Sequence, residues 1–161
     1  MKRTLILGYG NLDRQDDGVA WHILEKVAVL LNRTLPEKIE DKFIDLGENP
    51  DLYFNLQLIP EFADIIKDYE RVCFVDAHTG NVENDLNIVP VNACFQNSPF
   101  THHMTPETLL CFVDTLYQKL PEAILVSVRG YDFNFDRSLS DATEELAVQA
   151  SQWIVEWLNQ D

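Results

Sequence analysis

The sequence predicts a three-layer α/β fold, with a mostly parallel twisted sheet of about five strands and helices on both faces. Short apolar runs rich in β-branched residues alternate along the chain with longer runs in which apolar residues recur every three or four positions. Such an alternation is typical of a parallel sheet covered by helices. No internal repeat and no linker rich in Gly, Ser or Pro divides the 161 residues, so we expect a single domain over residues 1–161.

The first half of the chain is expected to contain three strands and two helices. Arg3–Leu7 is the first strand, and the helical spacing of apolar residues over Val19–Leu31 predicts the helix that follows. A second strand is expected at Lys42–Leu46 and a second helix at Tyr53–Tyr69. The third strand, Arg71–Ala77, is apolar on both faces, which favours a place in the centre of the sheet.

The second half is expected to add two strands and two helices. Asn87–Val91 is predicted to be an edge strand, because its proline cannot donate a ladder hydrogen bond. Thr105 offers a capping hydroxyl to a helix, and the proline after it fits the first turn. Ala123–Val128 is the next strand. A last helix begins at Ser140, and its stripe of Trp, Leu, Ile and Ala predicts packing against the core.

Charge and composition exclude several classes of partner. The 12 Lys and Arg against 27 Asp and Glu give a net charge of −15, which repels phosphate backbones and anionic lipid. The longest apolar runs are far shorter than the roughly 20 residues that a membrane helix needs. We therefore expect a cytoplasmic monomer that binds neither nucleic acid nor membrane. Cys73, Cys94 and Cys111 form no Cys-x-x-Cys pair and are expected to be buried, reduced thiols.

The first candidate site segment follows the first expected strand, where ligands bind in α/β sheets. Residues 8–18 begin like a dinucleotide-binding loop, but Asp13 takes the place of the third glycine. Asp16 and Asp17 would repel a pyrophosphate at the start of the helix. These carboxylates suit a cation, although Asp16 could equally cap the helix.

Two further loops carry residues that can bind a metal. Asp76 ends the most apolar strand, and burying a lone carboxylate costs several kcal/mol unless it is paired, solvated or bound to a cation. His102 and His103 precede the helix capped by Thr105, and at most one of two adjacent histidines is expected to be a ligand. Two carboxylates and one imidazole would form a coordination sphere with open positions. His78, close after Asp76, has no clear role.

Carboxylate chemistry without a metal is the alternative within the chain. A pair among Asp17, Asp45 and Asp76 could act as general acid and base, and nothing in the sequence ranks their pKa values. The sequence contains no His-Glu-x-x-His helix and no Gly-x-Ser-x-Gly elbow, so nucleophilic catalysis by the chain is not expected.

In the order and spacing of four motifs, the sequence resembles the hydrogenase maturation proteases, which remove a C-terminal extension from the large subunit of nickel-iron hydrogenases. The motifs are GYGN with DDG within residues 8–18, FIDLG at 43–47, VCFVDAHTG at 72–80 and THHMTPETLL at 101–110. The resemblance covers nearly the whole chain. It implies an endopeptidase whose partner is a hydrogenase large-subunit precursor.

The resemblance also implies a role for particular residues. Asp17, Asp76 and His103 are expected to bind nickel and to act in catalysis through it, and Asp45 is expected to support them. The nickel is supplied by the substrate, which holds it through cysteines, and no organic cofactor is expected. Two carboxylates and one imidazole bind unbound nickel weakly, so the thiolates of a loaded precursor would complete the shell.

One divergent loop leaves the partner open, and two alternative functions remain. The loop at 129–135 lacks a Pro-Glu pair that many members of the family carry, so the partner hydrogenase is not identified. A nickel carrier without catalytic activity could use the same three ligands. A peptidyl-tRNA-hydrolase-like enzyme would share the strand followed by Gly-x-Gly-Asn, but it needs a basic face that so acidic a chain hardly provides.

Overall fold

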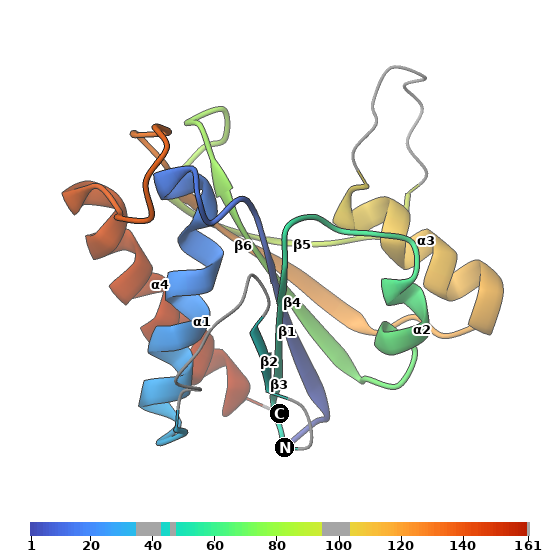
Figure 1. Cartoon of the computed structure of the whole chain (residues 1–161). Coiled ribbons are helices and arrows are strands. Elements are labelled where there is room, and N and C mark those ends of the chain that lie inside the picture. Colours follow the sequence, from blue (N-terminus) through green and yellow to red (C-terminus); the bar gives the residue numbers. More distant parts are fainter. Residues whose placement is uncertain (35–42, 46–47, 95–103, 161) are drawn as a thin grey trace.

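The computed structural model describes residues 1–34, 43–45, 48–94 and 104–160, with 43–45 described by their backbone alone. The chain forms a six-stranded sheet in the order β2-β3-β1-β4-β6-β5, with helices packed on both faces (Figure 1). The predicted three-layer α/β class is therefore confirmed.

The strands are β1 (Thr4–Tyr9), β2 (Phe43–Asp45), β3 (Asp51–Asn55), β4 (Arg71–His78), β5 (Leu86–Pro90) and β6 (Glu122–Arg129). The four inner strands β3, β1, β4 and β6 run parallel. The two edge strands run antiparallel to their neighbours, β2 to β3 and β5 to β6. The proline in β5 thus lies on an edge strand, as its missing amide hydrogen predicts.

The helices are the 3-10 helix η1 (Gln15–Gly18) and the α-helices α1 (Val19–Leu30), α2 (Phe62–Ile66), α3 (Pro106–Tyr117) and α4 (Asp141–Leu158). The Thr105 hydroxyl accepts a hydrogen bond from Thr108 N at 3.2 Å, and the Ser140 hydroxyl accepts one from Thr143 N at 3.4 Å. Both predicted N-caps are therefore present. Within the described part of the chain, no helix is long and apolar enough to cross a membrane.

The helix expected at Tyr53–Tyr69 is wrong over its first part, which forms the strand β3, while α2 covers only Phe62–Ile66. Leu52 and Phe54 face the core beneath α1, whereas Tyr53 faces the opposite side of the sheet. This alternation has the period of two that a strand requires. Pairing with β1 then supplies the backbone hydrogen bonds that a helix would otherwise have made.

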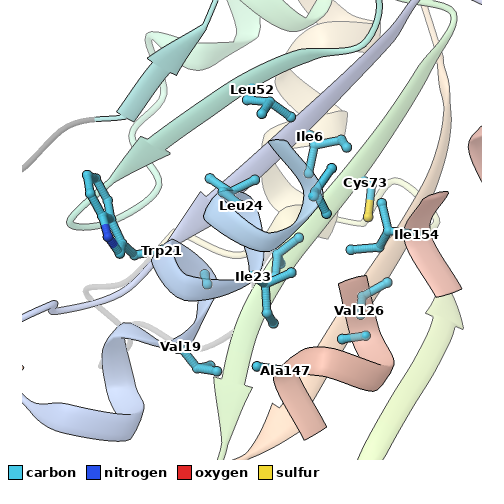
Figure 2. Packing of buried hydrophobic residues seen from close by; sticks show 14 of the residues in the cluster. Ile6, Val19, Trp21, Ile23, Leu24, Leu52, Cys73, Val126, Ala147 and Ile154 are labelled. Carbon is cyan, nitrogen blue, oxygen red and sulfur yellow. The ribbon is translucent and has the colours of Figure 1, made fainter. Parts of the chain in front are cut away.

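Two apolar layers hold the sheet, one on each face. Under α1 and α4, Ile6 and Cys73 of the sheet pack with Leu24 and Ile154 of the helices (Figure 2). The opposite layer, under α2 and α3, is built from the alternate strand residues and includes Phe74. Because a shift of one residue would exchange the two layers, this packing specifies the register that aligns β1 with β4.

The prediction that the three cysteines are buried, reduced thiols is confirmed only in part. No disulfide joins them, and Cys73 and Cys111 are buried as expected. Cys94 is exposed, contrary to the prediction. Its backbone amide donates to Glu107 O at 3.1 Å and its carbonyl accepts from the Thr108 hydroxyl at 3.2 Å. The segment is thus attached to α3 through its main chain, and the thiol is not needed in the core.

Candidate functional site

A cleft of about 680 Å³ lies at the carboxyl ends of β1 and β4. From β1 the chain proceeds to β3 on one side, and from β4 it proceeds to β6 on the other. The strand order therefore reverses between β1 and β4, which is where open α/β sheets bind ligands. Among the described residues, four titratable side chains line the cleft: Tyr9, Asp17, Asp76 and Glu107.

The segment between β1 and α1 is folded so that Asp17 faces this cleft. Gly10 has a φ of +145°, and a Cβ placed on it would come within 2.1 Å of the Asp17 carbonyl oxygen. Only glycine fits so close an approach of two backbone segments. The Gly10 amide donates to Asn55 O at 3.2 Å and the Asp17 amide to Arg14 O at 3.2 Å. Both sides of this approach are therefore held by main-chain hydrogen bonds.

The Asp17 carboxylate is half-buried and partly satisfied by the protein. Its Oδ2 accepts a hydrogen bond from the backbone amide of Asn11 at 2.9 Å. This bond orients the carboxylate without neutralising it. The negative charge of Asp17 is therefore available to a cation in the cleft.

Asp76 lies near the end of β4 on the other side of the cleft. Burial, and to a smaller extent the Asp17 carboxylate, raise its pKa, whereas hydrogen bonds from Ala77 N and from Tyr9 lower it, and the resulting pKa is about 7. The Ala77 amide donates to Asp76 Oδ1 at 2.7 Å. A carboxylate that is destabilised by burial and by a neighbouring carboxylate attracts either a proton or a metal cation.

Tyr9 and Glu107 line the same cleft and were not identified from the sequence as site residues. The Tyr9 hydroxyl hydrogen-bonds Asp76, and burial together with that carboxylate raises the tyrosine pKa well above its ordinary value. Glu107 lies in the first turn of α3, where an acidic residue is explained by the helix dipole alone. For Tyr9, the only available signal was its position within the GYGN motif at the end of a strand.

His103 lies outside the described residues, as does His102. The next residue along the chain, Met104, lines the cleft, and so does Thr105 at the start of α3. The role of His103 as a ligand stays a prediction.

Asp45 belongs to β2, and its side chain is outside the described residues. The strand β2 runs antiparallel to β3, and Asp45 pairs with Leu52 near the start of β3. The backbone of Asp45 is also separated from β1 by β3. The structure thus does not bring the Asp45 backbone to the cleft, and its supporting role stays a prediction.

Asp16, the neighbour of Asp17, is not in the cleft but fully buried. Its carboxylate accepts hydrogen bonds from the amides of Tyr131, Asp132 and Ser140 at 2.8 to 3.0 Å. The hydroxyls of Ser140 and Thr143 add bonds of 2.7 and 2.9 Å. Asp16 therefore joins η1 to the start of α4 and does not act as the cap of α1.

His78 has a structural role. Its Nδ1 accepts from Gly80 N at 3.0 Å, so its Nε2 carries the hydrogen that is donated to Asp85 O at 3.0 Å. Both ring nitrogens are thereby used to shape the turn after β4. Among the described residues, no group of three or more His, Cys, Asp or Glu is arranged to hold a metal ion.

We compared the chain with protein-family models, with curated proteins and with solved structures. No protein-family model and no curated protein matches the sequence. The [NiFe] hydrogenase maturation protease HycI from Thermococcus kodakarensis superposes with a TM-score of 0.67 at 18% identity, over 99% of this chain and 94% of that one. The hydrogenase maturating endopeptidase HybD from E. coli gives 0.68 at 15% identity, over 97% and 91%.

A hydrogenase 2 maturation peptidase from a Thaumarchaeota archaeon gives a TM-score of 0.63 at 21% identity, over 99% of this chain and 100% of that one. The chain has the fold of the hydrogenase maturation proteases. The resemblance found in the sequence motifs thus extends to the whole architecture. At identities this low, the similarity establishes the fold, and the activity has to be argued from the site.

Proposed function

We propose that this protein is an endopeptidase that removes the C-terminal extension of a nickel-loaded hydrogenase large-subunit precursor. The observation that carries the proposal is the meeting of Asp17 and Asp76 in one cleft at the strand-order reversal. The similarity in fold to endopeptidases of hydrogenase maturation supports the same conclusion.

In the proposed reaction, the nickel arrives as part of the substrate. Asp17 and Asp76 supply two oxygen ligands from opposite sides of the cleft, and His103 is the proposed nitrogen ligand. Carboxylate oxygen and imidazole nitrogen fill only part of a nickel shell, and the precursor's thiolates fill the rest. A precursor without nickel would lack the group that these three side chains recognise.

The raised pKa of Asp76 has a consequence for recognition. With a pKa of about 7, Asp76 is often protonated when the cleft is empty, and a cation displaces that proton when it binds. The bound nickel then either orients the scissile segment or polarises the attacking water. In both cases the protein contributes position and charge, and no nucleophilic side chain is required.

The decisive experiment compares nickel-loaded with nickel-free precursor as substrates of the wild-type protein. We expect cleavage of the loaded precursor only. Asp17→Asn, Asp76→Asn and His103→Ala should each lower kcat/KM for the loaded precursor by at least about a hundredfold, as is typical for loss of a group that holds the reacting assembly. Asp45→Asn should have a smaller effect.

Asp114→Asn is the matched control, because Asp114 is an exposed carboxylate on α3. It should retain wild-type activity. Equal cleavage of both precursors, or full activity of His103→Ala, would contradict the proposal. Tight binding of nickel ions alone, without any proteolysis, would instead support a carrier.

A further inference from the structure

The loop between β6 and α4 presents the most exposed large apolar side chain among the described residues. Phe135 is 82% exposed. Surface apolar residues are common singly, but an aromatic ring held in water on an ordered loop is typical of a contact site. The loop lies beside η1, the segment that carries Asp17 (Figure 1).

Hydrogen bonds hold this loop rigidly against the segment between β1 and α1. Gln15 N donates to Asp136 O at 2.8 Å, and Asp136 N donates to Asp13 O at 3.0 Å. Asn134 N donates to the Gln15 side chain at 3.0 Å, one residue before the exposed ring. Phe135 is therefore presented on a fixed backbone, which lowers the entropy that a partner would have to remove on binding.

The segment to which this loop is bound also borders the cleft. A second hollow of about 220 Å³ is lined by Gly10, Asn11 and Leu56, which also line the cleft, and by Asp13. Asp13 is the residue to which the loop is bound, since Arg137 Nε donates to its carboxylate at 2.7 Å. Leu56, 56% exposed, lies between the two hollows. A partner that reached the carboxylates along this surface would meet Leu56 and the loop.

Charge specifies the kind of partner that fits. Arg137 is neutralised by Asp13, and Arg14 is the other exposed cation of this segment. The same surface also contains two exposed acidic side chains, Asp132 and Asp136. Hydrogen bonds from Ser138 and Arg137 lower the Asp136 pKa, so that carboxylate is ionised at neutral pH. With the carboxylates of the cleft beside it, this surface has an apolar centre and an acidic border.

We propose that Phe135 and Leu56 form a docking surface for the folded body of the hydrogenase large-subunit precursor, which meets them with an apolar patch bordered by basic side chains. This inference rests on the proposed function and adds a second point of recognition to the nickel. A buried aromatic centre would supply binding energy, and complementary charge would orient the encounter. The cleft and the docking surface together then bring the extension to the reacting centre.

The test uses the full-length protein and the nickel-loaded precursor encoded by the same genome. Phe135→Ala should raise KM by at least about tenfold while kcat changes little, since truncating a central aromatic contact typically costs that much affinity or more. Phe135→Trp should restore KM. Leu120→Ala is the matched control, because Leu120 is 59% exposed and precedes β6 at the opposite end of the sheet.

The outcomes separate the two proposals. If the wild-type protein cleaves the precursor and Phe135→Ala has an unchanged KM, the docking surface is refuted and the proposed function stands. If the wild-type protein cleaves no precursor, both fail. A wild-type dimer that Phe135→Ala converts to a monomer would also refute the docking surface, because the ring would then contact a second copy of this chain.

Discussion

Asp16 and Asp17 show how adjacent carboxylates acquire different roles. Both lie in the 3-10 helix η1, whose geometry directs successive side chains apart. Asp16 is buried among amides and hydroxyls of the loop after β6 and of α4. Asp17 is held by one amide and faces the cleft. Asp16 therefore stabilises the fold, while Asp17 is placed in the cleft where the proposed substrate would bind.

The first prediction concerns Asp16. Asp16→Ala would leave buried amides and hydroxyls without an acceptor, at about 1–3 kcal/mol for each group that stays unsatisfied, so the free energy of unfolding at pH 7 should fall by about 3–5 kcal/mol. The measurement is urea unfolding. Asp114→Ala, on the exposed side of α3, should stay within about 0.5 kcal/mol of wild type.

Asp16→Ala should also change how the free energy of unfolding depends on pH in the acid range. Burial alone would raise the pKa of Asp16, but the hydrogen bonds from Asp132, Ser140 and Tyr131 outweigh it and lower the pKa. Its stabilising contribution is therefore complete above the ordinary value near 4 and is lost as the pH falls through the lowered value. The difference between wild type and Asp16→Ala should shrink below pH 4. A difference that is constant from pH 7 to pH 3 would contradict this account.

The second prediction concerns Asp76, for which stability changes with pH in the direction opposite to that for Asp16. Its folded-state pKa of about 7 lies above the unfolded value near 3.8, so wild-type stability decreases as the pH rises between these values. Asp76→Asn mimics the protonated acid and should be more stable than wild type at pH 8, with a gain of at most on the order of 4 kcal/mol. At pH 4 the two should have nearly equal unfolding temperatures.

Thermal unfolding at pH 4 and pH 8 measures this effect directly. The same substitution should abolish nickel-dependent cleavage, so stability and activity would change in opposite directions, as is common for residues of active sites. If Asp76→Asn is less stable than wild type at pH 8, the ionised Asp76 carboxylate does not destabilise the folded protein, which would contradict this account.

At the scale of elements, the loops at the carboxyl ends of β1 and β4 determine the site. The strands align the two loops through the register of Gly8 with Val75. The path of the first loop then depends on the close contact of Gly10 with the backbone of Asp17. The position of Asp17, a proposed ligand, is thus determined by a glycine seven residues before it.

The third prediction tests that dependence with two glycines that both have a positive φ. Gly10→Ala requires a side chain at φ +145°, with its Cβ 2.1 Å from Asp17 O, so Asp17 has to move. Gly80→Ala requires one at φ +91°, with its Cβ 2.9 Å from the flexible Arg129 side chain. Both should be destabilised, by about 1 kcal/mol or more.

Only Gly10→Ala should lose activity on nickel-loaded precursor. We expect its kcat/KM to fall by more than about tenfold, because a displacement of 1 Å can cost that much or more, while Gly80→Ala stays close to wild type. Steady-state kinetics at a temperature where both variants are folded makes the comparison. Equal losses in the two variants would attribute the effect to general destabilisation.

At the scale of the whole molecule, the net charge is −15, and many of the basic side chains within the described residues form ion pairs. Around the hollow at the amino ends of the strands, Lys2 pairs with Glu122 at 3.2 Å, and Lys67 pairs with Asp64 at 2.7 Å. Paired lysines of this kind release few counterions from a nucleic acid. The described surface therefore offers little to a polyanion.

The fourth prediction follows from this distribution. Transfer RNA should not be retained by the protein in filter binding, even at low salt, where electrostatic attraction to phosphates is strongest. Retention that weakens steeply with added salt would support the peptidyl-tRNA-hydrolase-like alternative and would count against a precursor with a basic docking border.

The sequence by itself determined the fold class, most of the strands and helices and the two capped helix starts, and it singled out Asp17 and Asp76 as candidate site residues. These follow from local signals, such as the period of apolar residues, a capping hydroxyl, or a carboxylate after an apolar run. The strand β3 was missed because its last three residues, Tyr53–Asn55, were assigned to the helix expected at Tyr53–Tyr69.

Only the tertiary structure decided which of these residues meet. Strand order places Asp17 and Asp76 at one cleft, brings Tyr9 and Glu107 to it, and separates the Asp45 backbone from it. The tertiary structure also brings Asp16 to the start of α4, where the backbone amide of Ser140, more than 120 residues away along the chain, donates a hydrogen bond to its carboxylate. Strand direction and order depend on contacts between distant segments, and no local pattern of residue types contains that information.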